Sequence, residues 1–136
     1  MKKIILLLLL LIAFSQFSFS QVNKYQLSTH ILDITAGKPA QDVKITLAKK
    51  DKNGDWVNLD EKKTDKNGRI GDFIKQDGAN NTGIYKLTFH TKKYFQDNDY
   101  KTFYPYIEVV FELIDDEHYH VPITLSPFGY STYRGS

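Results

Sequence analysis

The sequence predicts an all-β protein, an antiparallel β-sandwich or barrel of eight short strands with one short helix. Apolar and polar residues alternate with a period of two along much of the chain, as in Val43, Ile45 and Leu47 opposite Lys44 and Thr46. Such alternation is the pattern of half-buried strands. Turn-forming clusters separate these segments about every 8 to 12 residues, a spacing typical of sandwiches and barrels.

Turn chemistry bounds each strand in the first half of the chain. Gly37 follows the first strand, and Asn67-Gly68 precedes the fourth. The segment Asp51–Asp55 resembles the start of a calcium loop, but Trp56 stands where Gly is required and Lys62 where Glu is required. We therefore interpret it as a hairpin turn. The first four expected strands are residues 25–34, 42–50, 56–63 and 69–74.

One segment in the second half breaks the alternation. Thr91–Asp97 begins with a residue that can cap a helix and contains no β-branched residue after it, so we expect a short helix with Thr91 as its N-cap. The turns Gly78–Gly83 and Asp115–Glu117 separate strands on either side of this helix. The last four expected strands are residues 84–90, 105–114, 118–125 and 128–134.

The N-terminus has the pattern of a secretory signal peptide. Two lysines precede the apolar run Ile4–Phe14, which is shorter than the roughly 20 residues that cross a bilayer, and Ser18 and Ser20 supply small residues before a cleavage point. The chain has no cysteine for lipid attachment. We expect a signal peptide at residues 1–20 and one domain at residues 21–136, exported to the periplasm and not bound to the membrane after processing.

The charge balance argues against a polyanion as partner. The formal net charge of the whole chain is +2, and the only charged residues in the first twenty are two lysines. The processed chain therefore has a net charge of zero, which removes the support for nucleic-acid binding.

Histidine and arginine side chains mark a candidate site. In the strand that contains His118 and His120, alternation turns both histidines away from the core. Together with His30 they could form a three-histidine zinc site, although solvated or structural histidines are the commoner outcome. Arg69 follows a turn and begins a strand, where it is either a surface residue or a group that stabilises a developing oxyanion.

The C-terminal segment combines aromatic and polar groups where most chains fray. Tyr130, Tyr133 and Arg134 lie within five positions of one another near the end of the chain. Such a segment can line a polar pocket, and with the two histidine regions it indicates an enzyme site.

Two long motifs and the end of the chain resemble a known family. The motif of Leu27–Asp33, continued by Gly37–Ala40, and the motif Tyr119–Ser131 are similar to the two signatures of the transthyretin-like family. The tetrapeptide Tyr133–Ser136 resembles the ending of its hydrolase branch, the 5-hydroxyisourate hydrolases, which the hormone carriers of the family lack. The resemblance covers essentially the whole chain after the signal peptide.

The resemblance implies an architecture and a reaction. The implied fold is a transthyretin-like (prealbumin-like) sandwich of two four-stranded sheets with one short helix, assembled as a homotetramer with active sites at the dimer interface. The implied reaction is the hydrolysis of 5-hydroxyisourate, with His30, Arg69 and His120 as the catalytic set and without a cofactor or metal. The alternatives are a transthyretin-like carrier that binds an aromatic small molecule in an inter-dimer channel and, more remotely, an accessory β-sandwich.

The tail has an implied role in substrate binding. Tyr133 and Ser136 would form hydrogen bonds with the amide edges of the substrate ring. Arg134 would either bind substrate with them or attach the tail to its neighbours.

Overall fold

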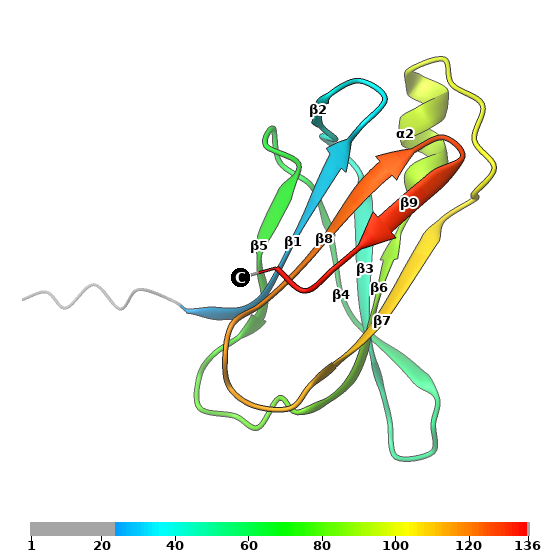
Figure 1. Cartoon of the computed structure of the whole chain (residues 1–136). Helices are drawn as coiled ribbons and strands as arrows, with labels where there is room; N and C mark the ends of the chain where they lie inside the picture. Colours follow the sequence, from blue (N-terminus) through cyan, green and yellow to red (C-terminus); the bar gives the residue numbers. More distant parts are fainter. Residues whose placement is uncertain (1–23, 136) are drawn as a thin grey trace, which may run out of the picture.

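The computed structural model describes residues 24–135, which form two β-sheets packed face to face with one short helix at one end (Figure 1). One sheet contains β1 (Tyr25–Asp33), β2 (Lys38–Pro39), β5 (Arg69–Lys75), β8 (Tyr119–Ser126) and β9 (Gly129–Thr132). The other contains β3 (Lys44–Lys50), β4 (Trp56–Lys63), β6 (Gly83–Phe89) and β7 (Ile107–Leu113). The helix is α2 (Thr91–Asp97). The predicted signal peptide lies outside the described residues.

The eight predicted strands are all present, and each boundary lies within two residues of its predicted position. They divide four and four between the sheets, as the family resemblance implied. The two-residue strand β2 was not predicted; it pairs with the end of β1 on the side where β5 pairs with its beginning. The segment Asp51–Asp55 is the hairpin turn between β3 and β4, closed by a hydrogen bond from the Asp51 N–H to the Asp55 carbonyl oxygen at 2.9 Å.

One strand pair departs from the predicted antiparallel arrangement. Strands β1 and β8 are parallel neighbours, with Ser28 opposite His120 and His30 opposite Pro122. Parallel neighbours need a long crossover connection, and here that connection contains the whole second sheet and the helix. Alternation in the sequence identifies which face of a strand is buried but carries no information on the direction of its neighbour.

The core lies between the sheets and consists of the inward-facing half of each alternating strand. Fully buried examples are Leu27 and Ile123 from one sheet and Leu47 and Leu87 from the other. Burying one such side chain contributes about 1.5–3 kcal/mol. Because successive side chains on a strand face opposite ways, this core turns the partly exposed His30 toward the outer face of its sheet.

The helix begins one residue earlier than the predicted cap implied. Thr91 is its first helical residue and His90 occupies the N-cap position, without a capping hydrogen bond from its side chain. The prediction of Thr91 as N-cap was wrong because the His90 N–H still donates to the Lys44 carbonyl oxygen at 2.9 Å, so strand pairing continues to the helix start. The Tyr94 hydroxyl then attaches the helix to β1 by donating to Asp33 Oδ2 at 2.8 Å.

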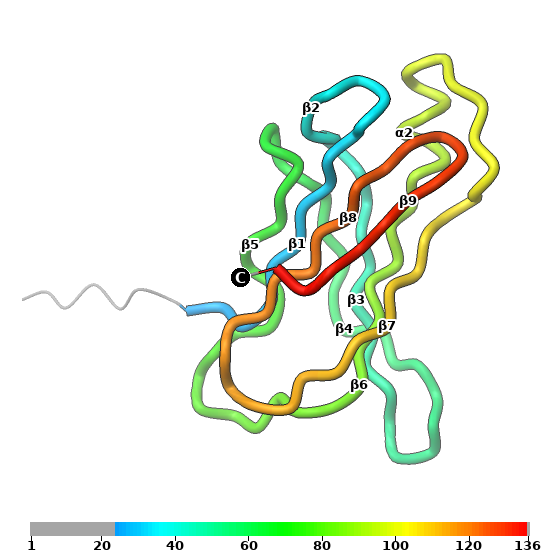
Figure 2. The backbone as a smooth tube through the Cα atoms, viewed as in Figure 1, coloured from blue at the N-terminus to red at the C-terminus, as the bar shows by residue number. Residues whose placement is uncertain are grey.

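The segment after β9 returns across the first sheet. Figure 2 shows it leaving β9 and crossing toward the start of β1. The Gly135 N–H donates to the His120 carbonyl oxygen at 2.8 Å, which attaches this segment to β8. No helix in residues 24–135 is both long enough and apolar enough to cross a membrane.

Candidate active site

Arg69 and His30 are brought together by antiparallel pairing of β5 with β1, in which the two residues lie directly opposite one another. The turn before Arg69 is held by Asp65, whose Oδ1 accepts the Arg69 N–H at 2.9 Å. Gly68 closes the turn with a φ of +70°, and a Cβ there would lie only 2.6 Å from the Ile31 carbonyl oxygen. This position therefore requires glycine, and the turn places Arg69 at the histidine.

His120 joins the same face through the parallel pair of β1 and β8. Its Nδ1 lies 2.8 Å from the Ser28 hydroxyl oxygen, and His118 Nε2 lies 2.9 Å from that same oxygen. One serine hydroxyl on β1 thus contacts His120 of β8 and His118, which directly precedes that strand. Since Ser28 and His30 are two residues apart on one strand, both point to the same face of the sheet.

The pKa values of His30 and His120 are both lowered from their ordinary value of 6.5. Burial is the main cause for each, and the positive charge of Arg69 is the second. The charges of His30 and His118 lower the pKa of His120 further. Both histidines therefore favour the neutral form near pH 7, which is the form that can accept a proton.

The tail has two parts with different surroundings. Gly135 lies against the His120 ring, where an added Cβ would come 2.5 Å from the ring carbon Cδ2. The Arg134 guanidinium instead lies over the ring of Tyr119, 4.6 Å from its centroid, and Tyr133 is 61% exposed. These two side chains line a cavity of about 310 Å³ with residues of β7, beside the candidate site.

The predicted site residues thus fall into three groups. His30, Arg69 and His120 share one outer face. Tyr133 and Arg134 lie at the edge of the sandwich, where the Arg134 guanidinium lies over the Tyr119 ring, and their role in substrate binding stays a prediction. Ser136 lies outside the described residues. Within residues 24–135, no cluster of three or more His, Cys, Asp or Glu side chains is arranged to hold a metal ion.

Sequence reasoning did not identify two contributors. Ser28 received no role from the sequence, although alternation alone places it on the same face as His30. Gly135 gave no chemical signal, because its role is to leave room for the His120 ring.

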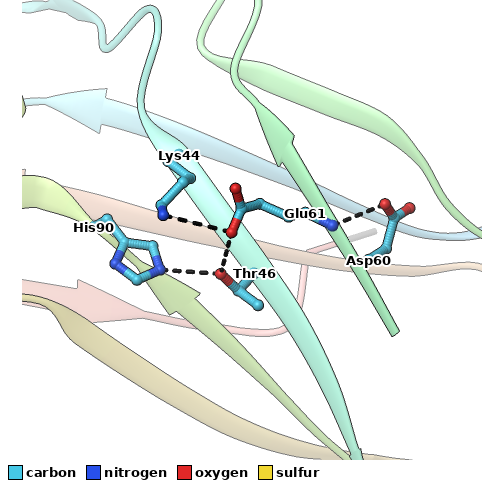
Figure 3. Close-up of polar contacts among 5 residues, drawn as sticks. All are labelled: Lys44, Thr46, Asp60, Glu61 and His90. Carbon is cyan, nitrogen blue, oxygen red and sulfur yellow. Dashed lines mark hydrogen bonds and ion pairs between the residues drawn. The ribbon is translucent and has the colours of Figure 1, made fainter. Parts of the chain in front are cut away.

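The fourth histidine, His90, lies apart on the outer face of the other sheet (Figure 3). Its Nε2 is 3.0 Å from the hydroxyl oxygen of Thr46. The Thr46 hydroxyl donates to Glu61 Oε2 at 3.5 Å, and Lys44 forms an ion pair with that same oxygen at 3.4 Å. Burial and Lys44 lower the pKa of His90, whereas Glu61 raises it.

The fold and the outer face define a transthyretin-like sandwich with two histidines and an arginine gathered on one sheet. Residues 27–135 match the model of the HIUase/Transthyretin family, and the chain belongs to that family. This confirms the family expected from the sequence.

The similar proteins include 5-hydroxyisourate hydrolases as well as a transthyretin. The 5-hydroxyisourate hydrolase of Salmonella typhimurium is 46% identical over 111 residues, covering 81% of this chain and 80% of that protein. The solved 5-hydroxyisourate hydrolase of Klebsiella pneumoniae matches with a TM-score of 0.70 and 34% identity, over 81% of this chain and 98% of that one. Sea bream transthyretin in complex with thyroxine matches with a TM-score of 0.75 and 31% identity, over 81% and 94%. Fold alone therefore does not separate catalysis from binding.

Proposed function

We propose that the protein hydrolyses 5-hydroxyisourate to 2-oxo-4-hydroxy-4-carboxy-5-ureidoimidazoline in urate degradation. The observation that carries the proposal is the grouping of His30, Arg69 and His120 on one outer face, with the pKa of both histidines lowered. Relatives named 5-hydroxyisourate hydrolase support the assignment of the substrate.

The reaction needs a base, an oxyanion partner and a proton donor, all of which the chain supplies. A neutral histidine takes a proton from water as the water oxygen attacks a ring carbonyl carbon, which typically contributes about 10² to 10⁴ in rate. Arg69 stabilises the negative charge that develops on the carbonyl oxygen. The ring C–N bond then breaks, the carbon becomes a carboxylate, and the leaving nitrogen takes the proton.

The rival function is that of a carrier which binds an aromatic small molecule between dimers. The fold similarity to a transthyretin bound to thyroxine favours it. The chemistry of the outer face opposes it, because two half-buried histidines and an arginine provide a proton acceptor and a cation where an aromatic ligand needs apolar contacts.

We also propose that the processed chain, residues 21–136, is an exported homotetramer. Support for assembly comes from β7 and β9, which are the terminal strands of their sheets on the same side of the sandwich (Figure 1). Exposed edges of this kind are suited to pairing with another chain. Apolar side chains are also exposed there, including Phe128 at 70% and Val110 at 57%. The signal-like sequence of residues 1–20 supports export to the periplasm.

The proposed reaction is tested by following the ultraviolet absorbance of freshly prepared 5-hydroxyisourate with and without the protein. We expect faster decay with protein than without it. Equal rates would overturn the proposal, and saturable quenching of Trp56 fluorescence by an aromatic ligand such as thyroxine would then support the carrier. Light scattering tests the tetramer, and N-terminal sequencing of exported protein tests cleavage near residue 21.

A further inference from the structure

A chain of three hydrogen bonds ends at the His120 ring. His118 Nδ1 lies 2.9 Å from the Tyr25 carbonyl oxygen, and His118 Nε2 lies 2.9 Å from the Ser28 hydroxyl oxygen. That hydroxyl oxygen lies 2.8 Å from His120 Nδ1. The chain joins two residues of β1 with His120 of β8 and with His118, which directly precedes β8, and its first member is a backbone group whose hydrogen-bonding role is fixed.

The positions of the protons follow from this fixed end. A carbonyl oxygen only accepts, so His118 Nδ1 must carry a hydrogen and donate it to Tyr25. In neutral His118 the other nitrogen, Nε2, has a lone pair and accepts the single hydrogen of the Ser28 hydroxyl. While His118 is neutral, Ser28 has no hydrogen left for His120 and accepts one from His120 Nδ1.

We propose that Ser28 and His118 are positioning residues that fix His120 in the tautomer with Nδ1 protonated, leaving the Nε2 lone pair as the general base for water. This assignment deepens the proposed function and rests on it. Within the described residues, His30 differs in that its ring forms a hydrogen bond with the backbone of Asn67 and has no comparable chain through side chains.

The surroundings of His120 favour this assignment. Gly135 lies against the ring, so the ring cannot move far from Ser28 on that side. Arg69 and His30 act on the ring electrostatically and favour its neutral form. A neutral ring with one nitrogen committed to Ser28 has only its other nitrogen available for a proton from water.

The direct test is ¹⁵N nuclear magnetic resonance of the parent protein at neutral pH, with each histidine assigned by the loss of its signals in a single variant. We expect His120 Nδ1 to show the shift of a protonated nitrogen and Nε2 that of a bare one. The opposite pattern, or an even mixture of tautomers, would overturn the proposal. This readout does not require turnover, so it remains valid even if the proposed function fails.

The kinetic test is Ser28→Ala, which removes the hydroxyl that orients His120. We expect kcat to fall about 10- to 100-fold, by analogy with the hydrogen-bond partners that orient metal-binding histidines, with little change in KM and a mixed tautomer in the ¹⁵N spectrum. Ser28→Thr keeps a hydroxyl and should restore both the rate and the tautomer. An unchanged kcat and tautomer in Ser28→Ala would overturn the proposal.

The matched control is Thr46→Ala on the other sheet, which removes a hydroxyl that contacts His90 in the same manner. We expect its kcat to equal that of the parent. A comparable fall in Thr46→Ala would overturn the proposal, because loss of rate would then reflect general damage to strand packing. A parent protein that fails to accelerate ring opening would instead contradict the proposed function and leave the tautomer assignment to the ¹⁵N spectrum.

Discussion

The two outer faces of the sandwich carry similar histidine clusters that differ in their charge balance. On each face a histidine contacts a hydroxyl, His120 of β8 with Ser28 and His90 at the helix N-cap with Thr46, and burial is the main cause of its lowered pKa. The Thr46 hydroxyl donates to Glu61, so His90 must donate to Thr46 through Nε2. His120 donates to Ser28 through Nδ1 instead.

The difference lies in the carboxylate. Glu61 neutralises the charges around His90, because it pairs with Lys44 and receives the Thr46 hydroxyl. The charges that lower the pKa of His120 are Arg69 and other histidines, whereas Asp65 raises the pKa of His30 and accepts hydrogen bonds within its own turn. A contact between a histidine and a hydroxyl therefore does not by itself define a functional site. The positive charge on the His120 face is what would stabilise an oxyanion there.

The largest expected effect on kcat is that of an asparagine substitution at His120, compared with the same substitution at His90. His120→Asn removes the proton acceptor while keeping size and polarity, and should lower kcat by about 10² to 10⁴. His90→Asn should leave kcat unchanged. Initial rates from the absorbance assay give kcat for both variants. An equal fall in kcat in the two variants would show that the difference between the two faces does not affect catalysis.

Arg69→Gln should lower kcat by about 10² to 10³, because it removes the cation expected at the developing oxyanion. It should also raise the pKa of His30 and His120, whose values Arg69 lowers. The base then becomes protonated at higher pH, so the acid limb of the kcat/KM profile should shift upward. Lys44→Gln is the control: it removes a charge that lowers the pKa of His90 and should leave the profile in place.

Gly135→Ala tests whether the tail fixes the His120 ring. A Cβ at this position would come 2.5 Å from the ring, so either the ring or the tail must move. We expect a fall of up to about 10² in kcat, since a displacement of about 1 Å can have this effect. Gly71→Ala is the matched control, because nothing lies within 4 Å of a Cβ there. Equal kcat values in Gly135→Ala and Gly71→Ala would show that the contact of the tail with His120 does not contribute to catalysis.

The smallest effect concerns stability at acid pH. His30, His90 and His120 all have a folded-state pKa below 6.5, so the unfolded chain binds more protons as the pH falls below that value. Stability should therefore decrease in that direction, lowering the melting temperature at about pH 5 relative to about pH 7.5 by a few degrees. Substituting His90 and His120 together with Asn should reduce this dependence. A melting temperature that rises on acidification would contradict the pKa directions on both faces.

The sequence predicted the elements because each depends on a local pattern, whereas the catalytic set of His30, Arg69 and His120 came from the family resemblance and stays a prediction. Alternation placed His120 on an outward face, and turn chemistry placed Arg69 at the start of a strand. The pairing of β1 with β8 in parallel and the contact of Gly135 with His120 depend on neighbours far apart in the chain, which no local pattern encodes. The N-cap of the helix was misassigned because the last strand pair continues through His90.

The parallel pair of β1 and β8 also determines when the site can exist. Ser28 and His120 are separated by 92 residues, so their contact must wait until nearly the whole chain is available to fold. Distant pairings of this kind carry a large loop-closure cost and typically place β-sandwiches among the slower folders, in milliseconds to seconds. A chain still emerging from the ribosome or threading through a translocation channel has β1 but not β8, and so has no assembled histidine pair. The enzyme proposed here would become active only after β8 has been synthesised and transported.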